Sequence, residues 1–230
     1  MTEPSRGVDA LRQLATELDV SDIRRTLAGF DRTGSSDRSW RVFLDATGGA
    51  PNLGERSQRQ ELARLLRSWG CRHLRRADDA MTTEALSSWW REGRELMPPA
   101  ARPLVDLDDT DLRDAARAFD GLATRPAAHR MTPTSARIVT FGSTAAAKAM
   151  FMVRPLAFPP WDAAIALGFG RRRPTGADYA AYVEACAQTL RHVSARVGVA
   201  VDDLPAELGR PSSTPAKIVD EFLWLRLTRG

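Results

Sequence analysis

TFGSTAAAKAMFMVRPLAFPPWDAAI, residues 140–165, joins a glycine turn to an alanine-rich segment and ends with an aspartate behind two prolines. The alanines predict a helix from Thr144 to Val153 whose small side chains let another helix approach closely. Pro155 ends this helix, because proline lacks the amide donor that would continue it. The Pro159-Pro160 pair restricts the connection to Asp162, which we expect to cap the next helix.

The turn formed by Phe141, Gly142 and Ser143 is expected to join a short helix, residues 132–140, to the alanine-rich helix. The first amides of a helix have no intrahelical acceptor, so they are available to an anion. The turn therefore predicts a phosphate site at Gly142 and Ser143.

The rest of the chain shows the three- and four-residue spacing of apolar side chains that is typical of amphipathic helices. This spacing predicts two short helices within 8–30 and helices at 55–69, 82–96, 108–122, 178–197 and 214–227. Residues 33–36 and 48–51 predict loops on either side of Trp40 and Phe43. No segment shows the alternation typical of a strand, so the sequence predicts an all-α fold.

Two tryptophans in the 82–96 helix, Trp89 and Trp90, are adjacent and cannot both face one core. We expect core packing, with one ring exposed or packed against a second lobe; base stacking is the alternative.

In the last helix, Lys217 and Glu221 have the spacing of a surface ion pair, and Trp224 is expected in the core. A second acid or base at Asp220 or Glu221 is the alternative to this surface pair.

Composition sets further limits. Of 230 residues, 43% are hydrophobic and 27% are charged, which is ordinary for a soluble globular protein. No apolar run approaches the roughly 18 to 20 residues that a membrane span needs. The start of the chain lacks the regions of a secretory signal. We therefore expect one compact, cytoplasmic unit with no membrane partner.

Metal and cofactor chemistry has few candidate residues. Cys71 and Cys186 are far apart, and the histidines at 73, 129 and 192 form no cluster at metal-ligand spacing. The sequence predicts two buried thiols, no metal site and no cofactor.

The basic residues are nearly all arginine: Lys148 and Lys217 are the only lysines among 33. Arginine's planar fork suits phosphate oxygens. Arg171, Arg172 and Arg173 follow one another in a loop and are expected to clamp phosphates around the site, a solvated basic loop being the alternative.

The residues around the turn resemble the helix-hairpin-helix DNA glycosylase superfamily. Its motif is hydrophobic-Gly-hydrophobic-Gly-x-x-x-Ala, followed by a catalytic aspartate in a Pro-x-(Val)-Asp loop. Phe141, Gly142 and Ala146 occupy matching positions. Asp162 follows Thr144 by eighteen residues, which is the family's separation between its lysine position and its aspartate. The resemblance covers roughly residues 132–200.

Departures from the family motif narrow the activity that the resemblance implies. Thr140 replaces the first glycine, and Thr144 replaces the lysine that forms a Schiff base in bifunctional members. Lys148 lies one turn further along the helix, either as an ion-pair partner of Asp162 or as a displaced nucleophile. The family's four-cysteine iron–sulfur loop has no counterpart here.

The resemblance implies a two-lobed helical fold, with an N-terminal lobe at 1–125 and a hairpin lobe at 126–230. It also implies a monomeric, monofunctional hydrolase that cleaves the nucleobase–sugar bond in DNA, as in DNA repair, or in a nucleoside. Asp162 would be the central carboxylate, Lys148 and Thr144 further catalytic candidates, and Trp161 part of the base pocket.

Several alternatives stay open. In the first alternative, Asp162 serves only as a helix cap. In the second, the chain is a non-catalytic nucleic-acid-binding or regulatory module. A third is an interaction protein that uses exposed tryptophans. The chain is also similar to uncharacterised bacterial proteins that share Gly-x-Thr-x-x-x-Lys, Pro-x-Asp and Lys-x-x-Asp-Glu, which match residues 142–148, 160–162 and 217–221 here.

Overall fold

The computed structural model describes residues 6–31, 38–131 and 135–229. Helices form most of this part of the chain, which confirms the prediction of a mainly helical protein. The elements in chain order are α1 (Arg6–Arg12), the π-helical η1 (Gln13–Glu17), α2 (Val20–Asp31), α3 (Arg38–Thr47), α4 (Arg56–Ser68), η2 (Arg76–Asp78), α5 (Asp79–Gly93), η3 (Arg94–Leu96), η4 (Leu104–Asp106), α6 (Asp109–Ala123), β1 (Pro126–Met131), β2 (Ala136–Thr140), α7 (Ser143–Val153), α8 (Ala163–Gly168), α9 (Gly176–Val197), η5 (Val201–Asp203), α10 (Leu204–Glu207) and α11 (Pro215–Arg229).

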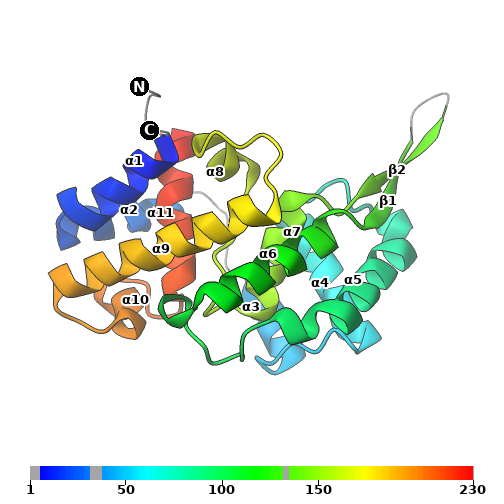
Figure 1. Ribbon diagram of the computed structural model, residues 1–230, viewed down its shortest axis with the longest axis horizontal. Helices are drawn as coiled ribbons and strands as arrows, with labels where there is room; N and C mark the ends of the chain where they lie inside the picture. Colours follow the sequence, from blue (N-terminus) through cyan, green and yellow to red (C-terminus); the bar gives the residue numbers. More distant parts are fainter. Residues whose placement is uncertain (1–5, 32–37, 132–134, 230) are drawn as a thin grey trace.

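The two ends of the described chain pack together. Helices α1 and α2 contact α11, and α1 also contacts α8 and α9, as Figure 1 shows at its upper left. Helices α3 to α7 and the two strands form the other side of the molecule. The two sides meet where α6 packs along α9. One continuous hydrophobic core includes residues from both sides. The division into lobes at 1–125 and 126–230 stays a prediction.

The segment before Gly142 is a strand, so the prediction of a helix there is wrong for residues 136–140. β1 and β2 form an antiparallel ribbon in which His129 lies opposite Ile138 and Arg130 lies opposite Arg137. Residues 136–140, ARIVT, end in three β-branched side chains, which favour extended backbone. Alternation fails to mark this strand because four of its five residues are exposed. Thr132 and Pro133 lie outside the described residues.

Helix α5 buries both of its tryptophans, with 1% of Trp89 and 8% of Trp90 exposed. The Trp89 indole donates to the carbonyl of Ala118 on α6 at 2.8 Å. The Trp90 ring lies 5.8 Å from the Arg154 guanidinium. Core packing is therefore confirmed, and of the two alternatives for one ring, exposure or packing against a second lobe, exposure is excluded because α5 is covered on more than one side. The helix also begins at Asp79, earlier than predicted.

Helices α6 and α9 hold the loop that precedes α9 in place. A Cβ added to Gly176 would lie 2.1 Å from the carbonyl oxygen of Ala116, so only glycine permits this approach of the two helices. The Gly176 amide donates to Asp120 at 2.7 Å. Thr175 and Asp178 close a capping box at the start of α9. The segment 171–175 is thereby fixed at one end.

Cys71 and Cys186 are buried and form no disulfide, as predicted. Burial raises the pKa of the Cys71 thiol from 9.0 to about 11 and raises the pKa of Cys186 still further. We expect neither thiol to react with iodoacetamide in the folded protein at about pH 8, and both to react after unfolding in guanidinium chloride. Rapid labelling of the folded protein would contradict this burial.

The raised pKa of Cys71 also predicts that the protein becomes less stable at alkaline pH. From about pH 9 to about pH 11 the unfolded chain loses the Cys71 proton that the folded chain retains. The unfolded state therefore binds fewer protons, so the free energy of unfolding should fall as the pH rises through this window. Urea unfolding at both ends of the window measures the fall, and the variant C71A should show less of it.

Candidate functional site

Gly142 forms the turn that starts α7. Its φ of 77° and ψ of 158° lie in a region open almost only to glycine. The Phe141 amide donates to the carbonyl of Arg125 at 2.8 Å, and the Gly142 amide donates to the carbonyl of Ala123 at 2.9 Å. The turn is thus anchored to the end of α6. The predicted glycine turn is present, but the Gly142 amide is already engaged within the protein.

The N-terminus of α7 has no side-chain cap. Its first helical hydrogen bond runs from the Ala146 amide to the carbonyl of Gly142 at 3.0 Å. The amides of Ser143, Thr144 and Ala145 precede this bond and have no intrahelical acceptor. These groups form the positive end of the helix dipole.

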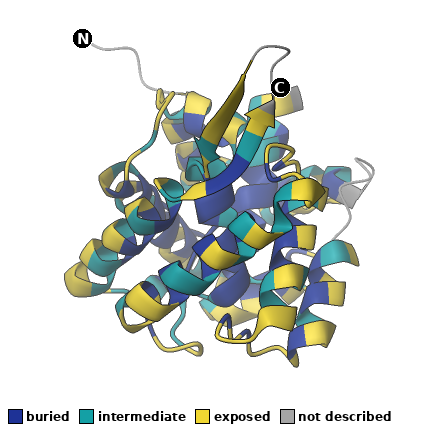
Figure 2. Cartoon of the chain, turned by 90° about the vertical axis from the view of Figure 1, so that its right-hand side faces the viewer, coloured by how far each residue is buried: buried dark blue, intermediate teal, exposed yellow. Residues whose placement is uncertain are grey.

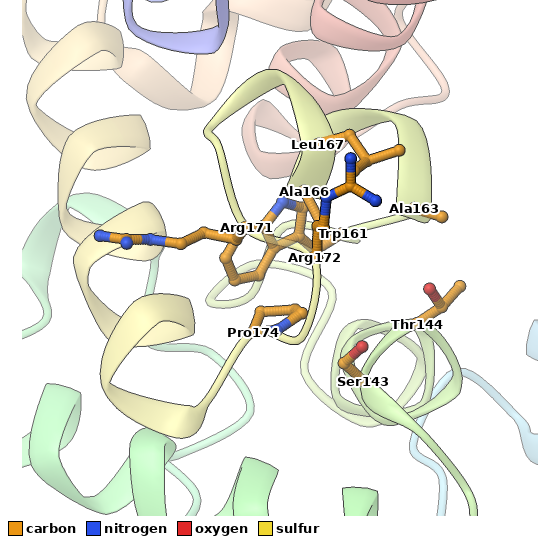
Figure 3. Close-up of a pocket in the computed structure, with 9 residues that line it drawn as sticks. All are labelled: Ser143, Thr144, Trp161, Ala163, Ala166, Leu167, Arg171, Arg172 and Pro174. Atoms are coloured by element: carbon orange, nitrogen blue, oxygen red, sulfur yellow. The ribbon is translucent and has the colours of Figure 1, made fainter. Parts of the chain in front are cut away.

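A cavity of about 210 Å³ adjoins this helix start. Figure 3 shows the side chains around it, which come from α7, from α8, from Trp161 in the connection before α8, and from the loop before α9. The lining residues are Ser143, Thr144, Trp161, Ala163, Ala166, Leu167, Arg171, Arg172 and Pro174. Five of the predicted site residues therefore line one cavity: Ser143, Thr144, Trp161, Arg171 and Arg172.

The two arginines of the cavity differ in their contacts. Arg171 extends toward α9, where its Nε lies 2.8 Å from Asp178 Oδ1. Arg172 lies on the side of α8 and makes no ion pair with any carboxylate in the described parts of the chain. Arg173 is exposed and does not line the cavity. The three guanidiniums do not converge, and Arg172 supplies the available positive charge.

Trp161 forms a rigid wall of the cavity. Its ring stacks on Tyr182 at 4.9 Å between centroids and on Tyr179 at 5.9 Å. Both tyrosine hydroxyls donate to carbonyls of the Pro159-Pro160 pair, which fixes the connection. The buried Trp161 Nε1 has no hydrogen-bond acceptor among the described residues.

Asp162 caps α8, as predicted. Its Oδ1 accepts from the amides of Ala164 at 2.8 Å and Ile165 at 3.0 Å. Asp162 does not itself line the cavity, although its neighbours Trp161 and Ala163 do. The other carboxylate oxygen accepts no hydrogen bond within the described ranges. The carboxylate is therefore held in one orientation at the edge of the cavity.

Lys148 lies one helical turn beyond Thr144, on the same face of α7. Its Nζ donates to the carbonyl of Trp69 at 2.5 Å, at the C-terminal end of α4. A cation there is stabilised by the negative end of the helix dipole. No ion pair joins Lys148 to Asp162, so that interpretation of the sequence is wrong for this structure.

Helix α11 carries a buried network of charges, not the predicted surface pair. Only 2% of Lys217 and none of Glu221 is exposed. Lys217 Nζ lies 2.8 Å from Asp220 Oδ2 and 3.5 Å from Glu221 Oε1, and Arg210 Nη2 lies 2.9 Å from Glu221 Oε1. Trp224, predicted in the core, is only partly buried. Lys217 and Glu221 lie close together, as their spacing predicts, but α1, α2, α8 and α9 pack around α11 and bury the pair.

Both lysines of the chain meet at Trp69. Lys217 Nζ lies 5.5 Å from the Trp69 ring and 4.5 Å from the Phe30 ring, and Lys148 Nζ lies 6.0 Å from the Trp69 ring. Sequence reasoning did not connect these two residues. The signal that points to them is their rarity: they are the only two lysines among 33 basic residues.

The buried network lies within electrostatic range of the cavity edge. Burial raises the pKa of Asp220, the charge of Asp162 raises it further, and Lys217 and Lys148 lower it. Lys148 of α7, Asp162 and helix α11, which are distant in sequence, therefore share one charged region. Lys217 belongs to this region and was expected, with Glu221, at the surface.

Comparison with known proteins provides no relative: no family model matches the chain, and no curated protein or solved structure matches it at the required significance. In the described segments, no helix combines the length and apolarity needed to cross a membrane. Among the same residues, no three His, Cys, Asp or Glu side chains gather as metal ligands.

The buried network predicts a large cost for removing one partner. In the variant K217M, Asp220 loses its buried counter-ion and Glu221 loses one of two, Arg210 being the other, so we expect the free energy of unfolding to fall by about 3–5 kcal/mol in urea. The control R64M breaks the exposed pair with Glu61 and should cost less than about 1 kcal/mol. Equal costs for the two variants would contradict the buried network.

Proposed function

We propose that the protein binds a phosphate of a nucleic acid in the cavity beside α7 and hydrolyses a nucleobase–sugar bond next to it, as a monofunctional glycosylase. The observation that carries this proposal is the position of Asp162. Its two neighbours in sequence line a cavity whose polar groups are suited to an anion.

The phosphate-binding part rests on donors from two segments. The uncapped start of α7 offers amides and the hydroxyls of Ser143 and Thr144, and Arg172 offers a guanidinium. A cavity of about 210 Å³ is smaller than the roughly 300–1,000 Å³ of sites that enclose whole ligands. The cavity therefore suits a phosphate group, with the rest of the ligand outside it.

The hydrolytic part rests on Asp162. Cleavage of an N-glycosidic bond builds positive charge on the sugar, which a nearby carboxylate stabilises. The cap fixes one oxygen of Asp162 and leaves the other to face a sugar or to orient water. Lys148 is held by the carbonyl of Trp69, and Thr144 carries no amine. A Schiff-base step has no nucleophile here, which favours hydrolysis without strand cleavage.

A second candidate is a nucleic-acid-binding module without catalysis. It is favoured by the hydrogen bonds of Asp162 Oδ1 to α8 and by the absence of Asp162 from the cavity lining. The same donors would then bind phosphate alone. An interaction protein that uses exposed Trp89 or Trp90 has no support, since both rings are buried.

The variant D162N separates the two candidates. Asparagine caps a helix about as well as aspartate, so the fold should be retained, while loss of the negative charge should lower base release by about 10²-fold or more. The measurement is base release from duplex oligonucleotides with single modified bases and from free nucleosides, together with binding of the same duplexes.

D108N makes the same change at the N-cap of α6 and should keep wild-type rates. Full activity of D162N would contradict the role of Asp162. A wild-type protein that binds duplex DNA tightly but releases no base would favour the binding module. A wild type that does neither would exclude both candidates.

Neighbouring arginines test the phosphate site. Arg172 lines the cavity and Arg173 does not. Loss of one charge-assisted hydrogen bond should weaken duplex binding by R172Q about tenfold or more, whereas R173Q should change it much less. Fluorescence anisotropy at low salt measures both. Equal losses would indicate a diffuse basic loop in place of a site.

A further inference from the structure

The ribbon formed by β1 and β2 carries two arginines that face each other. Arg130 pairs directly with Arg137 across the strands, so both side chains project from the same face. Both are exposed, and Figure 2 shows the outer part of the ribbon exposed above a buried base. Neither forms an ion pair with a carboxylate in the described residues. Like charges directly opposite one another destabilise a ribbon, and an anionic partner would offset this cost.

The base of the ribbon is held firmly. Thr82 Oγ1 of α5 donates to the carbonyl of Ala127 at 2.9 Å, and Ala127 and Ala128 are buried. The Phe141 amide closes the same end by donating to the carbonyl of Arg125, beside the Pro126–Thr140 pair. The two arginines therefore stand on a supported element at a defined distance from the body of the protein.

A loop rich in arginine lies against this base. His73 Nε2 lies 2.7 Å from the carbonyl oxygen of Phe141, and His129 Nδ1 lies 2.8 Å from Asp78 Oδ1. Next to His73 and between these contacts, three arginines are exposed and form no ion pair at 4.0 Å or less with any described carboxylate: Arg72, Arg75 and Arg76.

Acidic side chains near this surface are already engaged. Asp78 bonds His129, and Asp79 pairs with Arg67. Some exposed arginines elsewhere, such as Arg117, pair with a neighbouring carboxylate, whereas those of the loop and ribbon pair with none that the structure describes. The unpaired arginines of the loop and ribbon therefore give this surface a net positive charge.

We propose that the basic surface of the ribbon, formed by Arg130 and Arg137, docks the backbone of duplex DNA, with Arg72, Arg75 and Arg76 adding positive charge on the opposite face, where His129 contacts the loop. The ribbon leads to the cavity, because β2 ends at Thr140 and Ser143, which lines the cavity, starts α7. The inference rests on the nucleic-acid substrate proposed above and narrows it from a nucleoside to a polymer.

Duplex DNA fits the shape of this surface best. The major groove of B-DNA admits a two-stranded ribbon, whereas the major groove of A-form RNA is too narrow. Single strands are bound by stacking on exposed aromatic rings. The exposed large hydrophobic residues of the described chain are Val8, Val42, Ile138 and Leu167, none of them aromatic.

The test is the double variant R130Q/R137Q, with R56Q/R113Q as the matched control. Arg56 and Arg113 are exposed and lie near the N-terminal ends of α4 and α6, whose C-terminal ends lead to the loop and the ribbon. Binding of a duplex of about 20 base pairs is followed by anisotropy over a range of salt concentrations. Loss of two phosphate contacts should lower the slope of log K against log salt by about 1.8 and weaken binding at low salt. The control should keep the wild-type slope.

The outcomes separate this surface from the proposed reaction. A wild-type slope in R130Q/R137Q would overturn the surface while leaving base release and its dependence on Asp162 intact. Base release from free nucleosides by a protein that binds no duplex would overturn the surface and keep the hydrolase. Binding of duplex RNA or single-stranded DNA as tightly as duplex DNA would overturn the assignment of the partner. A lower slope for duplex DNA alone would support it.

Discussion

Lys148 and Lys217 both lie against Trp69, and these contacts hold together the helices on which the candidate site depends. Trp69 ends α4, Lys148 belongs to α7 and Lys217 belongs to α11. The Trp69 carbonyl accepts from Lys148, its ring faces Lys217, and its ring also stacks on Phe151 at 6.0 Å. Two ammonium groups near one ring are tolerated because Asp220, Glu221 and a helix C-terminus supply the compensating negative charge.

Two helix N-termini lie near the cavity and are treated differently. Helix α8 satisfies its first amides with the carboxylate of Asp162, whereas α7 begins at a glycine and has no side-chain cap. The carboxylate of Asp162 is the anion at the start of α8, whereas the first amides of α7 are available to an external anion. With Arg172 nearby, this difference explains how the proposed anion-binding cavity and a fixed carboxylate come to be neighbours.

Much of the fold could be predicted because its signals are local. Periodic leucines marked α4, and Asp108 and Asp162 marked the starts of helices that they do cap. The ribbon could not be predicted, because an exposed strand has no buried face to impose alternation. Burial of Lys217 also depends on residues far away in sequence, such as Phe30 and Trp69. Of the candidate site, the turn and the cap were predictable from spacing, whereas the separate contacts of Arg171 and Lys148 come from long-range packing.

The central claim is that the cavity holds a phosphate of duplex DNA while Asp162 faces the adjoining sugar. The most direct measurement is a crystal structure of the wild-type protein bound to a short duplex that contains one stable abasic-site analogue. We expect a phosphate within hydrogen-bonding distance of Arg172 and of the first amides of α7, with the analogue's sugar ring beside Asp162. A duplex bound on another face, or a cavity without phosphate in the complex, would contradict this claim.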